Sequence, residues 1–134
     1  MIALTLSGKI YKRHFEHAIG ATDILIALKH FQRFIARPMI VIWDRLNAHR
    51  AVLVQDYVAA HPDIDVEWLP PYAPDVNPEE GWHGNIKQHL RNAAPATPHD
   101  LRVQVDRGFA RLRRRPDLIL SFFRHAGLSV NQLC

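Results

Sequence analysis

Apolar residues recur along the chain with two different spacings, and the shorter spacing predicts strands. Alternation over Ile2–Ser7, a turn at Gly8 and the segment Ile10–Phe15 together predict a β-hairpin. The uninterrupted apolar run Met39–Trp43 is typical of a strand that is buried on both faces. A fourth strand is predicted at Val66–Leu69, where two prolines follow and end it.

The longer spacing, close to 3.6 residues, predicts helices between and after these strands. The first helix begins with Thr22 or Asp23 as its N-cap, and Thr97 with Asp100 resembles a capping box ahead of a basic helix. The predicted helices run from Thr22 to before Pro38, over Ala51–His61, over Pro78–Asn92, from Thr97 to about Arg114, and over Pro116–Phe123. This alternation favours an α/β fold, and 134 residues fit a single domain spanning 1–134.

Composition and charge narrow the class of protein. One cysteine, Cys134, excludes a disulfide framework and a cysteine-rich zinc module. Neither a membrane span nor a signal peptide is predicted, so a reducing cytoplasm is expected. The net charge of +4 divides into +5 over residues 1–50, −6 over 51–100 and +5 over 101–134. Such basic flanks suit an enzyme that binds a polyanion around an acidic site, although charges clustered on solvated faces explain them equally well.

Two carboxylate positions are candidates for chemistry. Asp44 directly follows a predicted buried strand, where open α/β sheets place their ligands. The alternative is an Asp that caps the next helix or anchors the turn. Glu79 and Glu80 open a helix after a rigid proline loop, and partnership with the helix dipole is the alternative for them. Carboxylates brought together from separate elements bind a hard divalent ion such as Mg²⁺.

The segments VIWDRLNAHR (Val41–Arg50) and LPPYAPDVNPEEGWHGNIK (Leu69–Lys87) resemble motifs of DDE (Asp-Asp-Glu) transposases. The similarity is to the C-terminal part of the catalytic domain in bacterial insertion-sequence transposases related to the mariner group. It implies a ribonuclease-H-like mixed sheet flanked by helices. It also implies DNA transposition through Mg²⁺- or Mn²⁺-dependent strand cleavage and strand transfer, with transposon ends and target DNA as partners. A bacterial, nucleoid-associated location in the cytoplasm follows from that function.

The resemblance also assigns roles to individual residues. Asp44 and Glu80 correspond to catalytic carboxylates that bind the metal, with Glu79 as an alternative for the second position. Three further residues are candidates for orienting the site or contacting phosphate: Asn47, His49 and Lys87. For Lys87, a solvated lysine is the competing interpretation.

The family's first catalytic Asp lies on a strand upstream of the hairpin, and no residue here takes its place. The sheet is therefore expected to lack its first strand, and the isolated chain is expected to be deficient in catalysis. A homo-oligomer or an upstream transposase segment is the expected partner. The competing functions are a non-catalytic DNA-binding remnant of a transposase and, less favoured, an unrelated metal hydrolase using some of the nine histidines.

Basic residues of the C-terminal segment are the expected DNA contacts. Arg107, Arg111 and Arg114 share one helical face, and Arg115 follows them directly. Phosphate contacts of this kind make binding strongly salt-dependent. A solvated basic face over a core stripe explains the helix equally well; the stripe residues are Leu101, Val105, Phe109 and Leu112.

Overall fold

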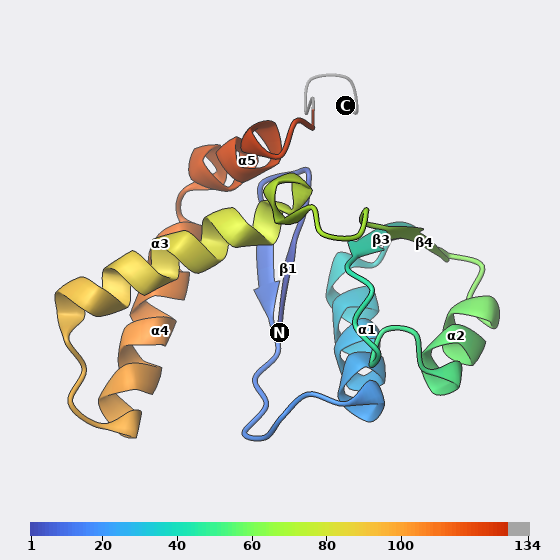
Figure 1. The fold of residues 1–134 in the computed structure, drawn as a ribbon, viewed down its shortest axis with the longest axis horizontal. Coiled ribbons are helices and arrows are strands. Elements are labelled where there is room, and N and C mark those ends of the chain that lie inside the picture. The colour runs from blue at the N-terminus through green and yellow to red at the C-terminus, as the bar shows by residue number, and fades with distance from the viewer. Residues whose placement is uncertain (129–134) are drawn as a thin grey trace. The chain divides into compact units, whose positions relative to one another are not determined.

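A computed structural model describes residues 1–128, and Cys134 lies outside the described residues. Within residues 1–128 there are five α-helices, one short 3-10 helix and two two-stranded sheets (Figure 1). The elements in chain order are β1 (Ile2–Leu4), β2 (Ile10–Lys12), α1 (Ala21–Ile35), β3 (Met39–Trp43), α2 (Val52–Ala59), β4 (Ile64–Trp68), η1 (Pro74–Val76), α3 (Pro78–Ala93), α4 (Pro98–Arg113) and α5 (Pro116–His125). The α/β class predicted from the sequence is confirmed, and it is compatible with a ribonuclease-H-like domain. In the described part of the chain, no helix is both long and apolar enough to cross a membrane.

The chain divides into two compact units. The first unit comprises Met1–Ala3 and Tyr11–Ala73, and the second comprises Leu4–Ile10 and the chain from Pro74 onward. The hairpin of β1 and β2 contributes residues to both units. Its strands are three residues each, shorter than predicted. The turn lies at Gly8 as expected, with a φ of 72° that favours glycine because it has no Cβ.

The first unit is built on a parallel pair of strands. β3 pairs with β4 in a register that sets Met39 opposite Ile64, and α2 forms the crossover between the two strands (Figure 1). One cluster of buried core residues comes from α1 and α2, which pack on each other. These core residues are Ile24, Leu28 and Val54.

Only one face of β3 meets this core. Val41 and Trp43 pack against it, whereas Ile40 and Ile42 are 67% and 51% exposed. The prediction of a strand buried on both faces is therefore wrong. A strand that packs on one core cluster buries alternate side chains, and an uninterrupted apolar run does not reveal which face is covered.

The start of α1 also differs from the prediction. Gly20 is the N-cap, in place of Thr22 or Asp23. Asp23 lies inside the first turn, where its Oδ2 accepts the Gly20 N–H at 2.9 Å and its Oδ1 lies 3.0 Å from His17 Nε2. The Gly20 N–H and the His17 ring both precede the first helical residue. Asp23 therefore contacts them from the third helical position and is not itself the N-cap.

The second unit is a cluster of three helices, α3, α4 and α5, in which each packs on the other two (Figure 1). Its core contains Ile86, Leu112 and Phe122. The predicted capping box of α4 is confirmed. The Asp100 N–H donates to Thr97 Oγ1 at 3.0 Å, and the Thr97 N–H donates to Asp100 Oδ2 at 3.1 Å.

Candidate active site

Asp44 follows β3 immediately, at the carboxyl end of a parallel strand. Its Oδ1 accepts the backbone N–H of Leu46 at 3.1 Å, which forms a turn of the Asx type. Its Oδ2 has no partner within residues 1–128, and the side chain is 54% exposed. One oxygen therefore anchors the turn, as the alternative interpretation predicts, and the ligand-binding role of Asp44 stays a prediction.

His49 is the predicted supporting residue that contacts Asp44. Its Nδ1 lies 2.9 Å from Asp44 Oδ1 and is hydrogen-bonded to the Asp44 carbonyl oxygen at 3.1 Å. Its side chain is only 15% exposed. Asn47 lies in the same turn, where its carbonyl oxygen accepts the Arg50 N–H at 3.2 Å and its side chain is exposed. The structure therefore brings His49 to the carboxylate and leaves the Asn47 side chain at the surface.

The second predicted carboxylate position begins α3. The side-chain oxygen of Asn77 accepts the Glu79 N–H at 3.0 Å, and Pro78 is the first helical residue, as predicted. Glu79 and Glu80 thus occupy the first turn, where backbone N–H groups favour negative charge. Their placement agrees with the helix-dipole interpretation and also presents a carboxylate next to a fixed helix start.

Glu80 has a histidine neighbour that the sequence interpretation missed. His83 Nδ1 lies 3.9 Å from Glu80 Oε1, and the Trp82 ring meets the His83 ring edge-on at 5.0 Å. The Glu80 side chain is 54% exposed. The spacing of three residues on a helix was a detectable signal for this contact. Lys87 is exposed about two turns further along α3, on the same face as Glu80.

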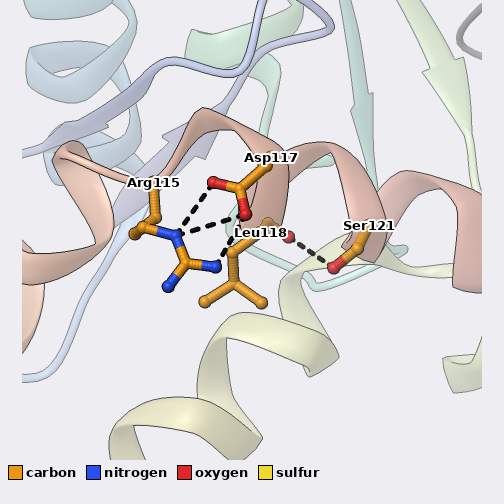
Figure 2. Close-up of polar contacts among 4 residues, drawn as sticks. All are labelled: Arg115, Asp117, Leu118 and Ser121. Atoms are coloured by element: carbon orange, nitrogen blue, oxygen red, sulfur yellow. Dashed lines mark hydrogen bonds and ion pairs between the residues drawn. The ribbon is translucent and has the colours of Figure 1, made fainter.

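The four predicted DNA-binding arginines have different surroundings. Arg111 donates a hydrogen bond to Asn85 on α3. Arg115 holds Asp117 with two nitrogens, Nε at 3.0 Å and Nη2 at 2.7 Å, while nearby Ser121 donates to the Leu118 carbonyl (Figure 2). The remaining two, Arg107 and Arg114, are exposed, and their side chains have no hydrogen-bond or ionic partner within the described part of the chain.

The Arg115–Asp117 fork changes the acid–base behaviour of both groups. The hydrogen bonds and then the charge of Asp117 raise the pKa of Arg115. The hydrogen bonds from Arg115 are the largest cause of the lowered pKa of Asp117. Arg115 is the N-cap residue of α5, so this exposed pair lies where α4 ends and α5 begins. We conclude that the Arg115 side chain already has a structural role.

The residues suit a divalent cation as individual ligands. Exposed carboxylate oxygens at Asp44 and Glu80 are the hard donors that Mg²⁺ and Mn²⁺ prefer. Among the described residues, no group of three or more His, Cys, Asp or Glu side chains is placed to hold a metal ion. Asp44 belongs to the first unit and Glu80 to the second. Asp44 and Glu80 therefore each present one carboxylate donor, in separate units.

Comparison with known protein families identifies one match. The profile of a family described as DDE superfamily endonuclease matches residues 1–102, well over half of the chain. The match includes Asp44, His49, Glu80 and Lys87, and it ends before Arg107. A search of curated proteins finds no match to this chain.

Proposed function

Because this chain belongs to the DDE superfamily of endonucleases, we propose that it is the C-terminal part of a transposase catalytic domain. In this proposal residues 1–134 form one part of the enzyme that cleaves and transfers DNA strands. The carboxylate of Asp44 carries the proposal, since it is exposed at the end of β3 with one oxygen engaged and the other available. A carboxylate that is held from one side in this way is prepared to bind a cation.

Asp44 and Glu80 are each proposed as a ligand of a Mg²⁺ or Mn²⁺ ion. Such an ion, when bound, supplies Lewis-acid stabilisation of the oxygens that gain charge during phosphoryl transfer. The protein contributes fixed carboxylates. The Asx turn holds Asp44, and the Asn77 cap sets the start of the helix that carries Glu80. Glu79, adjacent in the first turn, is the alternative ligand, and Asn47 and Lys87 are the proposed phosphate contacts.

We propose that a third acidic ligand comes from another segment, either an upstream part of the transposase or a second copy of the chain. The free edge and exposed face of β3 support this proposal. Within residues 1–128, β3 has β4 as its only strand neighbour, and Ile40 and Ile42 are exposed. An added strand satisfies the backbone groups of an unpaired edge. The isolated chain is accordingly expected to show little cleavage.

The proposed DNA contact is the basic side of α4. Arg107 and Arg114 are exposed and unpaired in the described residues, so their charges are available to phosphates. Arg111 and Arg115 are also proposed contacts, but each already bonds to a neighbouring side chain. We therefore rank Arg107 and Arg114 first. A non-catalytic DNA-binding remnant uses the same face, and it is the competing function.

The test is a plasmid-nicking assay with Mg²⁺ or Mn²⁺. Residues 1–134 are assayed alone and together with a separately produced segment that carries the family's first strand and its Asp, called the upstream segment. We expect little nicking alone and metal-dependent nicking when the upstream segment is added. Asp44→Asn and Glu80→Gln should each abolish it, whereas Asp56→Asn, an exposed aspartate on α2, should not. Nicking that survives in Asp44→Asn would refute the assignment, and DNA binding without nicking in any combination would favour the remnant.

A further inference from the structure

The imidazole of His49 is held flat against an aromatic ring. It stacks on the indole of Trp43 with centroids 4.5 Å apart and planes 6° from parallel. Trp43 itself packs against the core cluster of the first unit. The histidine therefore rests on a support that extends into the core, and its ring has little freedom to rotate or swing away.

The contacts of His49 define which ring nitrogen carries a proton. Nδ1 faces two oxygens of Asp44, the carbonyl oxygen at 3.1 Å and the carboxylate Oδ1 at 2.9 Å. Both oxygens are acceptors, so Nδ1 must be the donor in this arrangement. The Leu46 N–H donates to the same Oδ1 at 3.1 Å. Oδ1 thus accepts one backbone hydrogen bond and lies against Nδ1, whose hydrogen bond goes to the Asp44 carbonyl oxygen.

We propose that His49 is a positioning residue that fixes the Asp44 side chain and leaves Oδ2 as its one metal-binding oxygen. The metal-binding part of this inference rests on the proposed function; the positioning part does not. Oδ1 accepts the Leu46 N–H and lies 2.9 Å from Nδ1, whereas Oδ2 has no partner within residues 1–128. Asp44 therefore offers a single preset oxygen to a cation instead of a freely rotating carboxylate. Partners of this kind typically change metal affinity by about 10–100-fold when they are removed.

A second histidine in the same unit provides a matched comparison. His61 stacks on Tyr57 with centroids 3.9 Å apart, and its Nδ1 is hydrogen-bonded to the Tyr57 carbonyl oxygen at 2.7 Å. It shares the ring stack and the backbone contact of His49, but among residues 1–128 no carboxylate contacts its Nδ1. A substitution of His61 therefore measures the effect of losing a stacked histidine that does not contact a carboxylate. Only a change at His49 removes the donor to Asp44.

Three variants of the full chain separate the possible roles. His49→Phe keeps an aromatic ring on Trp43 but removes the donor. His49→Asn removes the ring but retains an N–H group at the position of Nδ1, because both nitrogens are bonded to Cγ. His61→Phe is the control. Thermal melting of each variant establishes that the fold is retained before any further measurement.

The first readout is the Asp44 side-chain conformation in metal-free protein, measured from three-bond NMR couplings to its Cγ. We expect one χ1 rotamer in the wild type, His49→Asn and His61→Phe, and rotamer averaging in His49→Phe. A single rotamer in folded His49→Phe would overturn the proposal, because Asp44 would then be fixed without the donor. Averaging in the wild type would overturn it equally.

The second readout is the broadening of resonances around Asp44 during titration with Mn²⁺ alone. The midpoint should rise about tenfold or more in His49→Phe and stay near the wild-type value in His49→Asn and His61→Phe. An unchanged midpoint in His49→Phe would refute the effect on metal binding. If Asp44→Asn shows the same broadening as the wild type while the rotamer result holds, His49 positions Asp44 but the proposed metal ligand is wrong. The two readouts thus distinguish failure of this inference from failure of the proposed function.

Discussion

Arg111 on α4 is hydrogen-bonded to the side-chain oxygen of Asn85 on α3. The same two helices contribute Leu112 and Ile86 to one buried core. The polar contact therefore lies at the exposed margin of an apolar interface. An arginine that is predicted to contact DNA is also hydrogen-bonded to a neighbouring helix, and the contribution of this bond to stability can be measured.

We expect Arg111→Ala and Asn85→Ala each to lower the free energy of unfolding by about 0.5–1.5 kcal/mol, the usual net value of one hydrogen bond. The double variant should be destabilised by less than the sum of the two single effects, since either change already breaks the bond. Urea denaturation of the four proteins measures the coupling. Strictly additive effects would show that the hydrogen bond contributes nothing to stability.

Replacing Arg107 and Arg114 with Ala should weaken DNA binding without lowering the melting temperature, because neither side chain has a protein partner in the described residues. For each phosphate that is no longer neutralised, the slope of log K against log salt should become shallower by about 1. Fluorescence anisotropy with a labelled duplex measures this slope. Arg33→Ala, at an exposed position on α1, is the control, and an equal effect there would indicate non-specific charge.

Arg115→Ala should weaken DNA binding less than the change at Arg107 or Arg114 and should lower the melting temperature more, because the Arg115 guanidinium is hydrogen-bonded to Asp117.

Gly81, directly after Glu80, allows α3 to approach α5. A Cβ at this position would lie 2.5 Å from Cδ1 and 2.8 Å from Cγ of the buried Phe122 ring. Gly81→Ala should therefore destabilise the second unit by about 1–3 kcal/mol through overpacking. Gly84→Ala is the matched control in the same helix, since a Cβ there meets nothing within 4 Å. Because alanine has a higher helix propensity than glycine, Gly84→Ala should stabilise the chain by about 0.5–1 kcal/mol. Similar melting temperatures for the two variants would contradict the close packing.

The start of α1 should make stability depend on acidic pH. The Gly20 N–H and then the His17 imidazole lower the pKa of the Asp23 carboxyl below its ordinary value. The unfolded chain binds this proton near its ordinary pKa of about 3.9. The stabilisation is therefore fully present above that pH and is lost as the pH falls through the lower folded pKa. The melting temperature of Asp23→Asn should be lower than that of the wild type between about pH 5 and 7, and the difference should shrink below about pH 4. A difference that is constant with pH would exclude the ionised cap contact.

Two features set by local sequence match their predictions. The bounds of β3, Met39–Trp43, match the prediction to the residue, because Pro38 and Asp44 interrupt the apolar run on both sides. The Thr97–Asp100 capping box also needs only neighbouring residues. The exposed face of β3 was not predictable, since the packing of α1 and α2 decides which alternate residues are buried.

In the candidate site, too, local sequence predicts some features and tertiary packing decides others. Local pattern alone placed Asp44 at the end of a strand and Glu80 in the first turn of a helix. The sequence alone thus determined that one strand ends at Trp43, that helices begin at Pro78 and after Thr97, and which carboxylates are candidates, because capping and turn formation act over a few residues. Tertiary structure decided which face of β3 is covered, that His49 lies on Trp43 and faces Asp44, and that Arg111 bonds Asn85. These contacts depend on packing between ring faces and between separate helices, which no local spacing specifies.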